Sequence, residues 1–205
     1  GSDGGGSIRI PSGFTGVFGF KPSFGRVPAY PASQFPNLSH VGPMTRTVAD
    51  AALMMNVLSL PDARDWTSLP YDNQDYRNEI KKGIGGLRVA FSPTLGFVDI
   101  DPVVEDLVRH AAISLSELGA EVEEIDPGFD SPREIFLTLW YSTAARMLKN
   151  IPKKNRKLVD PGLLQIADSG STITLEDYQH ASADRIMLGQ HMKQFHMTYD
   201  LLITP

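Results

Sequence analysis

A glycine-rich loop that ends in a serine opens the sequence, and its residue types could support nucleophilic chemistry. The loop reads Asp3-Gly4-Gly5-Gly6-Ser7-Ile8-Arg9. Consecutive glycines let backbone N–H groups turn inward without side-chain obstruction, as an oxyanion hole requires. A serine directly after them would present its hydroxyl beside those donors. Asp3 and Arg9 flank the serine at positions where they could pair and hold the loop in shape.

Two better-known glycine motifs do not fit this loop. A phosphate-binding loop ends in Gly-Lys-Ser/Thr, and no lysine is adjacent to Ser7. A hydrolase nucleophile elbow reads Gly-x-Ser-x-Gly, whereas Arg9 stands two positions after Ser7. A flexible linker remains the plain alternative on glycine content alone. The Ile8-Arg9-Ile10-Pro11 segment and the aromatic stretch that follows argue against a free linker.

The other residues able to do chemistry are more simply explained as solvated side chains. His191 and His196 are five positions apart and His180 is eleven before His191, so no pair has the i, i+4 spacing typical of zinc ligands. The two remaining histidines are His40 and His110. We therefore predict no metal and no cofactor. The basic segment 153–157 is short and is predicted to be a solvated loop or helix end.

The elements that would position the loop begin with an irregular segment. Residues 1–45 are rich in Gly, Pro, Ser and aromatics, show no helical periodicity, and predict packed loop and short strand. Thr47 is the predicted N-cap of a helix that runs to about residue 59. Residues 60–83 are polar, carry scattered prolines and predict a surface connection.

The second half of the chain predicts a βαβ unit followed by helices. A strand at 87–91, a helix capped by Asp101 and a strand at 121–125 should place the two strands side by side and parallel, with a right-handed crossover. A capping box at Ser131 predicts a helix to about residue 149, and Thr174 begins another to about residue 196. Residues 150–172 are predicted to be irregular, and a final strand covers 201–204. The fold class is α/β.

Composition limits the classes of function. The chain has 205 residues, 41% of them hydrophobic, and a net charge of -5, which argues against a nucleic-acid or membrane-surface role. No apolar run approaches the roughly 20 residues that span a bilayer. The absence of cysteine excludes disulfides and thiolate metal sites, and it is consistent with the expected cytoplasmic location.

Three blocks in order resemble the amidase signature family. Residues 1–12 (GSDGGGSIRIPS) resemble the second half of the amidase signature, and 14–27 (FTGVFGFKPSFGRV) and 40–52 (HVGPMTRTVADAA) match the same family in order and spacing. The βαβ unit and the closing YDLLITP resemble it more loosely. The resemblance implies a mixed, largely parallel sheet flanked by helices. It also implies one domain over 1–205, truncated at both ends, with the signature loop and following helix in 1–60 and the βαβ unit and helical region in 84–205.

The resemblance also implies roles for individual residues. Family members use a Ser–cis-Ser–Lys triad without a metal or a histidine base. Ser7 would be the nucleophile that attacks the amide carbonyl, and the oxyanion would be held by backbone N–H groups of Ser7 and of the glycines Gly4, Gly5 and Gly6. Asp3 and Arg9 match supporting polar positions. The acyl-enzyme would then be released by water or, in relatives, by another amine.

The chain departs from the family pattern in one respect. The family's lysine and cis-serine lie upstream of the segment where this sequence begins, and Lys21 matches a structural position. We therefore expect a fragment of the middle and C-terminal part of an amidase, and we expect this chain alone to hydrolyse little or nothing. Losing a triad partner leaves only weak residual catalysis, about 10³–10⁴-fold over water, and only where the oxyanion hole survives.

Three functional hypotheses follow from the sequence. The first is a general amidase acting on a small-molecule amide, and the second is the glutaminase subunit of a tRNA-dependent amidotransferase. That glutaminase typically has Ser-Leu-Asp-Gln-Ile-Gly-Pro where this chain has NLSHVGP at 37–43, which favours the general amidase. The third is a non-catalytic fragment of the scaffold. Apolar surface at fragment ends would also encourage association into a homo-oligomer.

Overall fold

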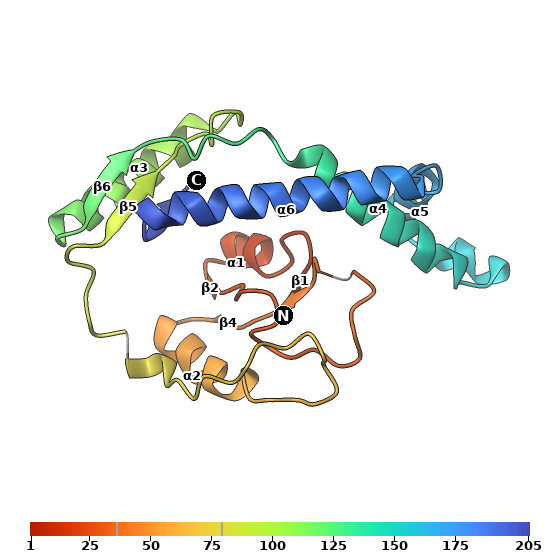
Figure 1. The fold of residues 1–205 in the computed structure, drawn as a ribbon, viewed down its shortest axis with the longest axis horizontal. Coiled ribbons are helices and arrows are strands. Elements are labelled where there is room, and N and C mark those ends of the chain that lie inside the picture. Colours follow the sequence, from red (N-terminus) through yellow and green to blue (C-terminus); the bar gives the residue numbers. More distant parts are fainter. Residues whose placement is uncertain (36, 79) are drawn as a thin grey trace. The chain divides into compact units, whose positions relative to one another are not determined.

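The computed structural model describes residues 1–35, 37–78 and 80–205, which divide into two compact units. Unit 1 spans Gly1–Lys82 and unit 2 spans Gly83–Pro205. The predicted fold class is confirmed, because the chain is mixed α/β and carries a parallel sheet with helices around it (Figure 1). The expectation of one domain over the whole chain stays a prediction.

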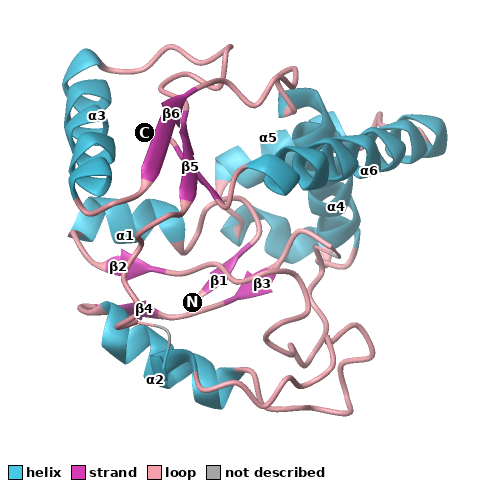
Figure 2. Ribbon diagram, turned by 60° about the vertical axis from the view of Figure 1, so that its left-hand side comes forward, coloured by secondary structure: helices cyan, strands magenta, loops and turns pink. Residues whose placement is uncertain are grey.

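Two short antiparallel strand pairs hold unit 1 together (Figure 2). Strand β1 (Ser2–Asp3) pairs with β3 (His40–Val41), which sets Asp3 opposite His40. Strand β2 (Phe18–Gly19) pairs with β4 (Met44–Thr45). Because β3 and β4 are separated by two residues only, the two pairs are joined directly, and the glycine loop that follows β1 is attached to this frame.

Helix α1 (Arg9–Thr15) corrects the prediction that residues 1–45 contain only loop and short strand. The helix has seven residues, includes a proline and a glycine, and has no apolar periodicity, so no sequence pattern marked it. Its place is set by packing instead, because Ile8 at its N-cap is fully buried. It ends at Gly16, whose φ of 65° is the left-handed conformation that glycine adopts without strain.

Helix α2 (Val48–Leu58) confirms the predicted helix and its cap. The Thr47 side chain accepts a hydrogen bond from the Asp50 N–H at 3.1 Å. The helix buries Ala51, Ala52 and Met55. A short 3₁₀ helix, η1 (Tyr76–Asn78), is the one regular element within the described part of the predicted connection at 60–83.

Unit 2 contains a parallel three-stranded sheet in the order β6-β5-β7. Strand β5 (Arg88–Phe91) lies at the centre between β6 (Glu121–Glu124) and β7 (Leu201–Ile203), with Arg88 opposite Glu121. The prediction that the two strands of the βαβ unit are parallel neighbours is confirmed; the handedness of their crossover stays a prediction. β5 carries the core of the sheet, because its last three residues are at most 2% exposed.

Helix α3 (Pro102–Glu117) connects β5 to β6 and begins as predicted. The Asp101 side chain accepts from the Val103 N–H at 2.8 Å. Gly119, at the predicted stop, has a φ of +96°. Much of the predicted apolar face stays in solvent: Val103 and Leu118 are each 68% exposed.

Three further helices form the rest of unit 2 (Figure 1). They are α4 (Arg133–Lys149), α5 (Pro161–Gly170) and α6 (Leu175–Thr198). Ala144 and Leu148 of α4 and Ala167 of α5 form a buried core between these two helices. Within the described residues no helix, including the 24-residue α6, is long and apolar enough to cross a membrane.

Two predictions for this helical region were wrong. The capping box at Ser131 does not form, because Pro132 is the N-cap of α4 and no side chain caps that end. Residues 150–172 are not irregular, since they contain α5 and the 3₁₀ helix η2 (Lys153–Leu158). The Asp160-Pro161 pair was an available signal, as an aspartate cap with proline at the first helical position is typical of a helix start. The predicted start of α6 is confirmed, with a capping box formed by Thr174 and Asp177.

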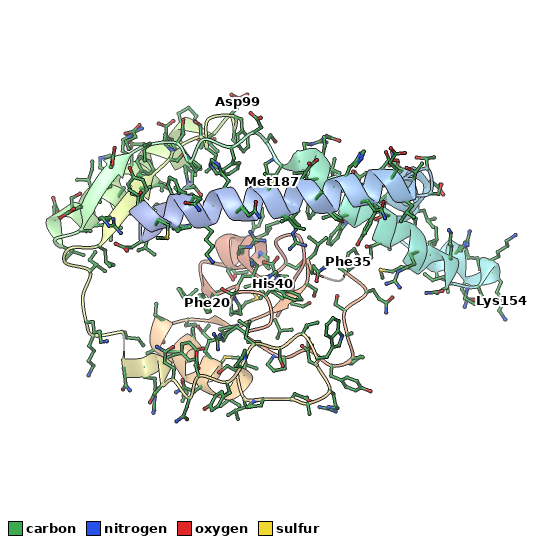
Figure 3. The ribbon with its side chains drawn as sticks, in the orientation of Figure 1. Phe20, Phe35, His40, Asp99, Lys154 and Met187 are labelled. Atoms are coloured by element: carbon green, nitrogen blue, oxygen red, sulfur yellow. The ribbon has the colours of Figure 1, made fainter. Side chains whose placement is uncertain are left out.

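The basic segment lies on η2 and is largely solvated, as predicted. Lys153, Lys154 and Lys157 are exposed. Figure 3 shows Lys154 projecting from the end of this element. The segment is therefore a solvated helical turn.

Candidate active site

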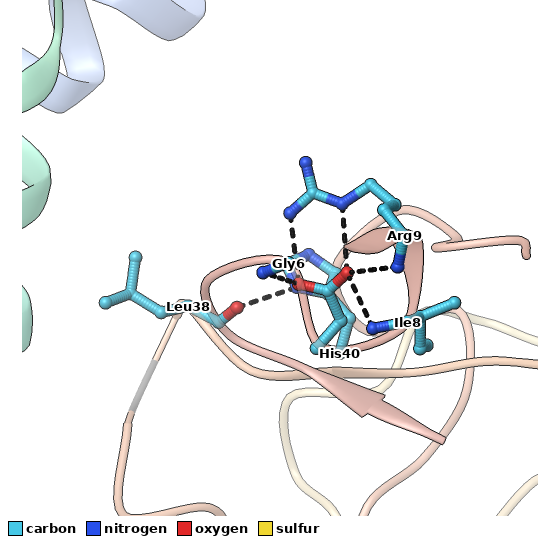
Figure 4. Close-up of polar contacts among 6 residues, drawn as sticks. Gly6, Ile8, Arg9, Leu38 and His40 are labelled. Atoms are coloured by element: carbon cyan, nitrogen blue, oxygen red, sulfur yellow. Dashed lines mark hydrogen bonds and ion pairs between the residues drawn. The ribbon is translucent and has the colours of Figure 1, made fainter. Parts of the chain in front are cut away.

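The carboxylate of Asp3 organises the glycine loop (Figure 4). Asp3 is 1% exposed and its two oxygens accept hydrogen bonds from the backbone N–H groups of Gly6 (2.6 Å), Ile8 (3.2 Å) and Arg9 (3.4 Å). The Arg9 guanidinium donates to the same carboxylate from Nε (2.9 Å) and Nη2 (3.0 Å). The pairing of Asp3 with Arg9 that the sequence suggested is confirmed, and it closes the loop into a tight turn.

Asp3 is ionised when the loop is formed. Burial by itself would raise the pKa of its carboxyl, but the hydrogen bonds from Arg9, Gly6 and Ile8 outweigh burial and hold that pKa well below its usual range. The same contact raises the pKa of the Arg9 guanidinium. A buried negative charge thus anchors the turn, and it is compensated by donors within six residues of sequence.

Glycine is required at the bend of the loop. Gly6 has a φ of +115°, and a Cβ built on it would lie 2.5 Å from Ile10 Cδ1. Gly42, in the β3–β4 connection, allows an equally close approach, because a Cβ there would lie 2.1 Å from the Phe20 carbonyl oxygen. The loop therefore turns at Gly6, and the fully buried Ile8 fixes it to the frame next to Gly42.

Ser7 lies at the exposed outer side of this turn, directly before α1. Within the described residues its hydroxyl has no hydrogen-bond partner, and neither do the N–H groups of Gly4, Gly5 and Ser7. The N–H of Gly6, in contrast, is engaged by Asp3. The described residues thus leave one hydroxyl and three amide donors, all within four positions of sequence, without a partner, and these are the kinds of group that attack on a carbonyl carbon and stabilisation of the oxyanion require.

His40 lies beside the anchor of the loop, and the sequence did not single it out for this position. It is opposite Asp3 in the β1–β3 pair, and its Nδ1 is 2.8 Å from the Leu38 carbonyl oxygen (Figure 4). Burial and the positive charge of Lys21 lower the pKa of its imidazole, which therefore stays neutral at pH 7. The available signal was its place at the start of the third sequence block, at 40–52.

A family model described as Amidase matches residues 1–205, the whole chain. This chain belongs to the amidase family. The resemblance stated from the three sequence blocks is therefore confirmed over the full length of the chain, including the βαβ unit and the closing strand.

Individual amidase-family relatives agree with this assignment. An acylamidase of Rhodococcus erythropolis is 36% identical over 208 residues, which cover 100% of this chain and 44% of that protein. A glutamyl-tRNA(Gln) amidotransferase subunit of Staphylococcus aureus is 42% identical over 126 residues, which cover 61% of this chain and 26% of that protein.

A solved structure shares the fold. The crystal structure of a bacterial aryl acylamidase of the amidase signature enzymes superposes with a TM-score of 0.88 at 30% identity, covering 100% of this chain and 44% of that one. The chain spans less than half the length of the acylamidases that it matches. The predicted roles of Ser7, the three glycines, Asp3 and Arg9 stay predictions; the structure shows the contacts of Asp3 with Gly6 and Arg9.

Proposed function

We propose that the protein to which this chain belongs is an amidase that hydrolyses the C–N bond of a carboxylic amide through an acyl-enzyme on Ser7. The observation that carries the proposal is the exposed Ser7 hydroxyl on a turn locked by the buried Asp3 carboxylate. The family membership and the acylamidase relatives support the reaction class. The substrate class would be a small acyl or aryl amide.

In the proposed reaction, the Ser7 Oγ attacks the carbonyl carbon and its proton passes to a base. The tetrahedral oxyanion is stabilised by N–H groups of Gly4, Gly5 and Ser7, which are unpaired within the described residues. The Gly6 N–H donates to Asp3, so in this proposal it holds the loop and not the oxyanion. Protonation of the leaving amine breaks the C–N bond and leaves the acyl ester on Ser7, and water then releases the carboxylic acid.

We propose that the base, which accepts the Ser7 proton, belongs to a part of the protein outside this chain. In this proposal the whole protein supplies the lysine and the bridging serine of the amidase signature from outside these 205 residues, and the coverage of 44% of the acylamidase relative supports this. A neutral lysine can accept the proton through a bridging serine, as in other Ser–Lys hydrolases. The structural role of Lys21 stays a prediction, and its positive charge lowers the pKa of the His40 imidazole.

The proposal is tested in the native, full-length protein with a neutral aryl amide such as acetanilide. Ser7→Ala should lower kcat at least about 10³-fold, because removal of a nucleophile removes transition-state stabilisation that binding cannot replace. A fluorophosphonate should add once to the unmodified protein and not to the variant, as read by intact mass. Ser116→Ala, an exposed serine on α3, is the matched control and should keep full activity.

Two results would contradict the proposal. Retention of activity in Ser7→Ala would exclude Ser7 as the nucleophile. Rapid fluorophosphonate labelling of Ser7 in this isolated chain would show that no base from outside it is required.

A tRNA-dependent glutaminase is the second candidate. The S. aureus amidotransferase relative is more identical to this chain than the acylamidase is, but it matches 61% of the chain rather than all of it. Full coverage and the NLSHVGP segment favour the general amidase. Glutamine hydrolysis that rises on addition of partner subunits and charged tRNA would reverse this choice.

A further inference from the structure

A cavity of about 320 Å³ lies in unit 1, away from the residues assigned to the reaction. One wall comes from the segment 23–29 and the opposite wall from the segment 64–67, while His40 and Val41 of β3 also line it. Ser7 and the three glycines do not line it. The cavity is thus separate from the proposed oxyanion site, although both adjoin the β1–β3 pair.

Hydrogen bonds join the two walls without any ligand. The Ala29 N–H donates to Asp65 Oδ2 at 2.8 Å, and the Leu69 N–H donates to the Gly25 carbonyl oxygen at 2.8 Å. Gly25 permits the close approach, because a Cβ there would lie 2.6 Å from the Thr67 carbonyl oxygen. The cavity is therefore preformed, as small-molecule sites usually are.

The charged groups of the walls are already paired, which decides the charge of a ligand. Among the described residues that line the cavity, the side chains with a full charge are Arg64 and Asp65. Arg64 donates to Asp62 from Nε (2.9 Å) and Nη2 (2.6 Å), and Asp65 accepts from the Thr67 N–H and hydroxyl as well as from Ala29. A charged ligand would lose its hydration, an anion would share Arg64 with Asp62, and a cation would meet an Asp65 carboxylate that already accepts three hydrogen bonds.

Each of the two walls carries an aromatic side chain, Phe24 on one and Trp66 on the other. Phe24 packs edge-on against the His40 ring at 5.7 Å between centroids, and the residue is 37% exposed. Trp66 is 92% exposed, although an indole normally buries most of its surface. A dry cavity of about 150 Å³ accommodates benzene, so about twice that volume suits a substituted or fused pair of rings.

We propose that this cavity binds a neutral, flat aromatic molecule of one or two rings, which Phe24 and Trp66 contact through their faces and edges. The inference does not depend on the proposed amidase activity, because no residue of the glycine loop takes part. The ligand buries apolar surface and contacts the aromatic rings. Hydroxyl and main-chain groups of the walls would hydrogen-bond its polar substituent.

The test is calorimetric titration of the chain with 2-naphthol, compared with 2-naphthoate, which has the same rings and a negative charge. We expect a dissociation constant for 2-naphthol below about 1 mM and binding of 2-naphthoate at least about tenfold weaker. Ala29→Leu places three carbons in the cavity and should weaken 2-naphthol binding at least about tenfold. Ala63→Leu makes the same change at an exposed position outside the walls and should leave binding unchanged.

Three results would overturn the inference: no binding of 2-naphthol, equal affinity for the two naphthalenes, or unchanged binding in Ala29→Leu. If Ala29→Leu fails to fold, as read by circular dichroism, Trp66→Ala replaces it. Trp66 is exposed, so its removal spares the core, and it should weaken 2-naphthol binding about fivefold or more. Undiminished binding by that variant would refute the site.

Discussion

Replacement of the buried anchor by its neutral isostere, Asp3→Asn, is the sharpest perturbation of the candidate site. The variant keeps the shape of the side chain but removes its charge and replaces one acceptor oxygen by an NH₂ group. That group would face N–H donors that now point at a carboxylate. We therefore expect the turn to lose its anchor while the rest of unit 1 stays intact.

The size of the effect follows from the contacts. The bonds from the Gly6 and Ile8 N–H groups to Asp3 are buried, and a hydrogen bond to a charged group contributes about 1.5–3 kcal/mol. Arg9 is 56% exposed and can be rehydrated, so its pairing adds about 0.5 kcal/mol. Asn keeps one acceptor, which leaves an expected loss of about 3 kcal/mol in the free energy of unfolding.

The stabilisation by Asp3 should depend on pH and decrease as the pH falls. The pKa of Asp3 is lowered in the folded chain from an ordinary value of 3.8, so its stabilisation is fully present above about pH 4 and is lost as the pH falls towards the folded-state pKa. The difference between the wild-type chain and Asp3→Asn should therefore be constant from pH 7 to pH 5. It should shrink by about 1 kcal/mol between pH 5 and pH 3.

Urea unfolding at pH 7, 5 and 3 measures both quantities. Asp72→Asn is the matched control, because Asp72 also pairs with an arginine, Arg26 at 2.9 Å, but its side chain is 35% exposed. Its loss should stay within about 1 kcal/mol. The reasoning would be refuted if Asp3→Asn lowered the free energy of unfolding by less than about 1 kcal/mol at pH 7. It would also be refuted if the difference in free energy of unfolding between the wild-type chain and the variant were the same at pH 3 as at pH 7.

Three smaller changes test other parts of unit 1 by the same unfolding measurement. Gly6→Ala should lower the free energy of unfolding by about 2 kcal/mol, because a φ of +115° strains any residue with a Cβ. In the native protein the same change should slow fluorophosphonate labelling of Ser7. An unchanged free energy of unfolding would contradict the need for glycine. Thr47→Ala should cost about 1 kcal/mol through loss of the α2 cap, and no loss would mean that the cap is dispensable. Ser12→Ala should be neutral or stabilising, because the buried Ser12 hydroxyl has no partner within the described residues. A loss above about 1 kcal/mol there would point to a partner for that hydroxyl.

Much of the fold was predicted from local sequence features, namely helix caps and the order of strands and helices. Thr47, Asp101 and Thr174 each cap the helix that they were expected to begin, since a side-chain oxygen three positions or fewer from an orphan N–H acts within one turn of chain. The alternation of strand, helix and strand likewise predicted a parallel pair, because the helix carries the chain back to the end of the sheet at which the first strand began. These features need no knowledge of distant residues.

Features that depend on distant residues were missed or wrong. Helix α1 is too short and too irregular to be predicted, and it exists because Ile8 is buried in unit 1. Helix α5 packs against α4 so closely that a Cβ on Gly170 would lie 1.9 Å from the Tyr141 carbonyl oxygen. Ser131 had the spacing of a cap, but Pro132 ends up as the N-cap of α4.

The sequence by itself determined the chemistry available at the glycine loop: a serine hydroxyl, consecutive glycine amides, and an aspartate and an arginine near enough in the chain to pair. Only the tertiary structure decided how those groups are used. Burial of Asp3 beside the β1–β3 pair turns its carboxylate onto the Gly6 N–H, and that leaves Gly4, Gly5 and Ser7 as the amides without a partner in the described chain. A one-dimensional pattern cannot distinguish these amides, because the distinction arises from which donor a buried charge can reach.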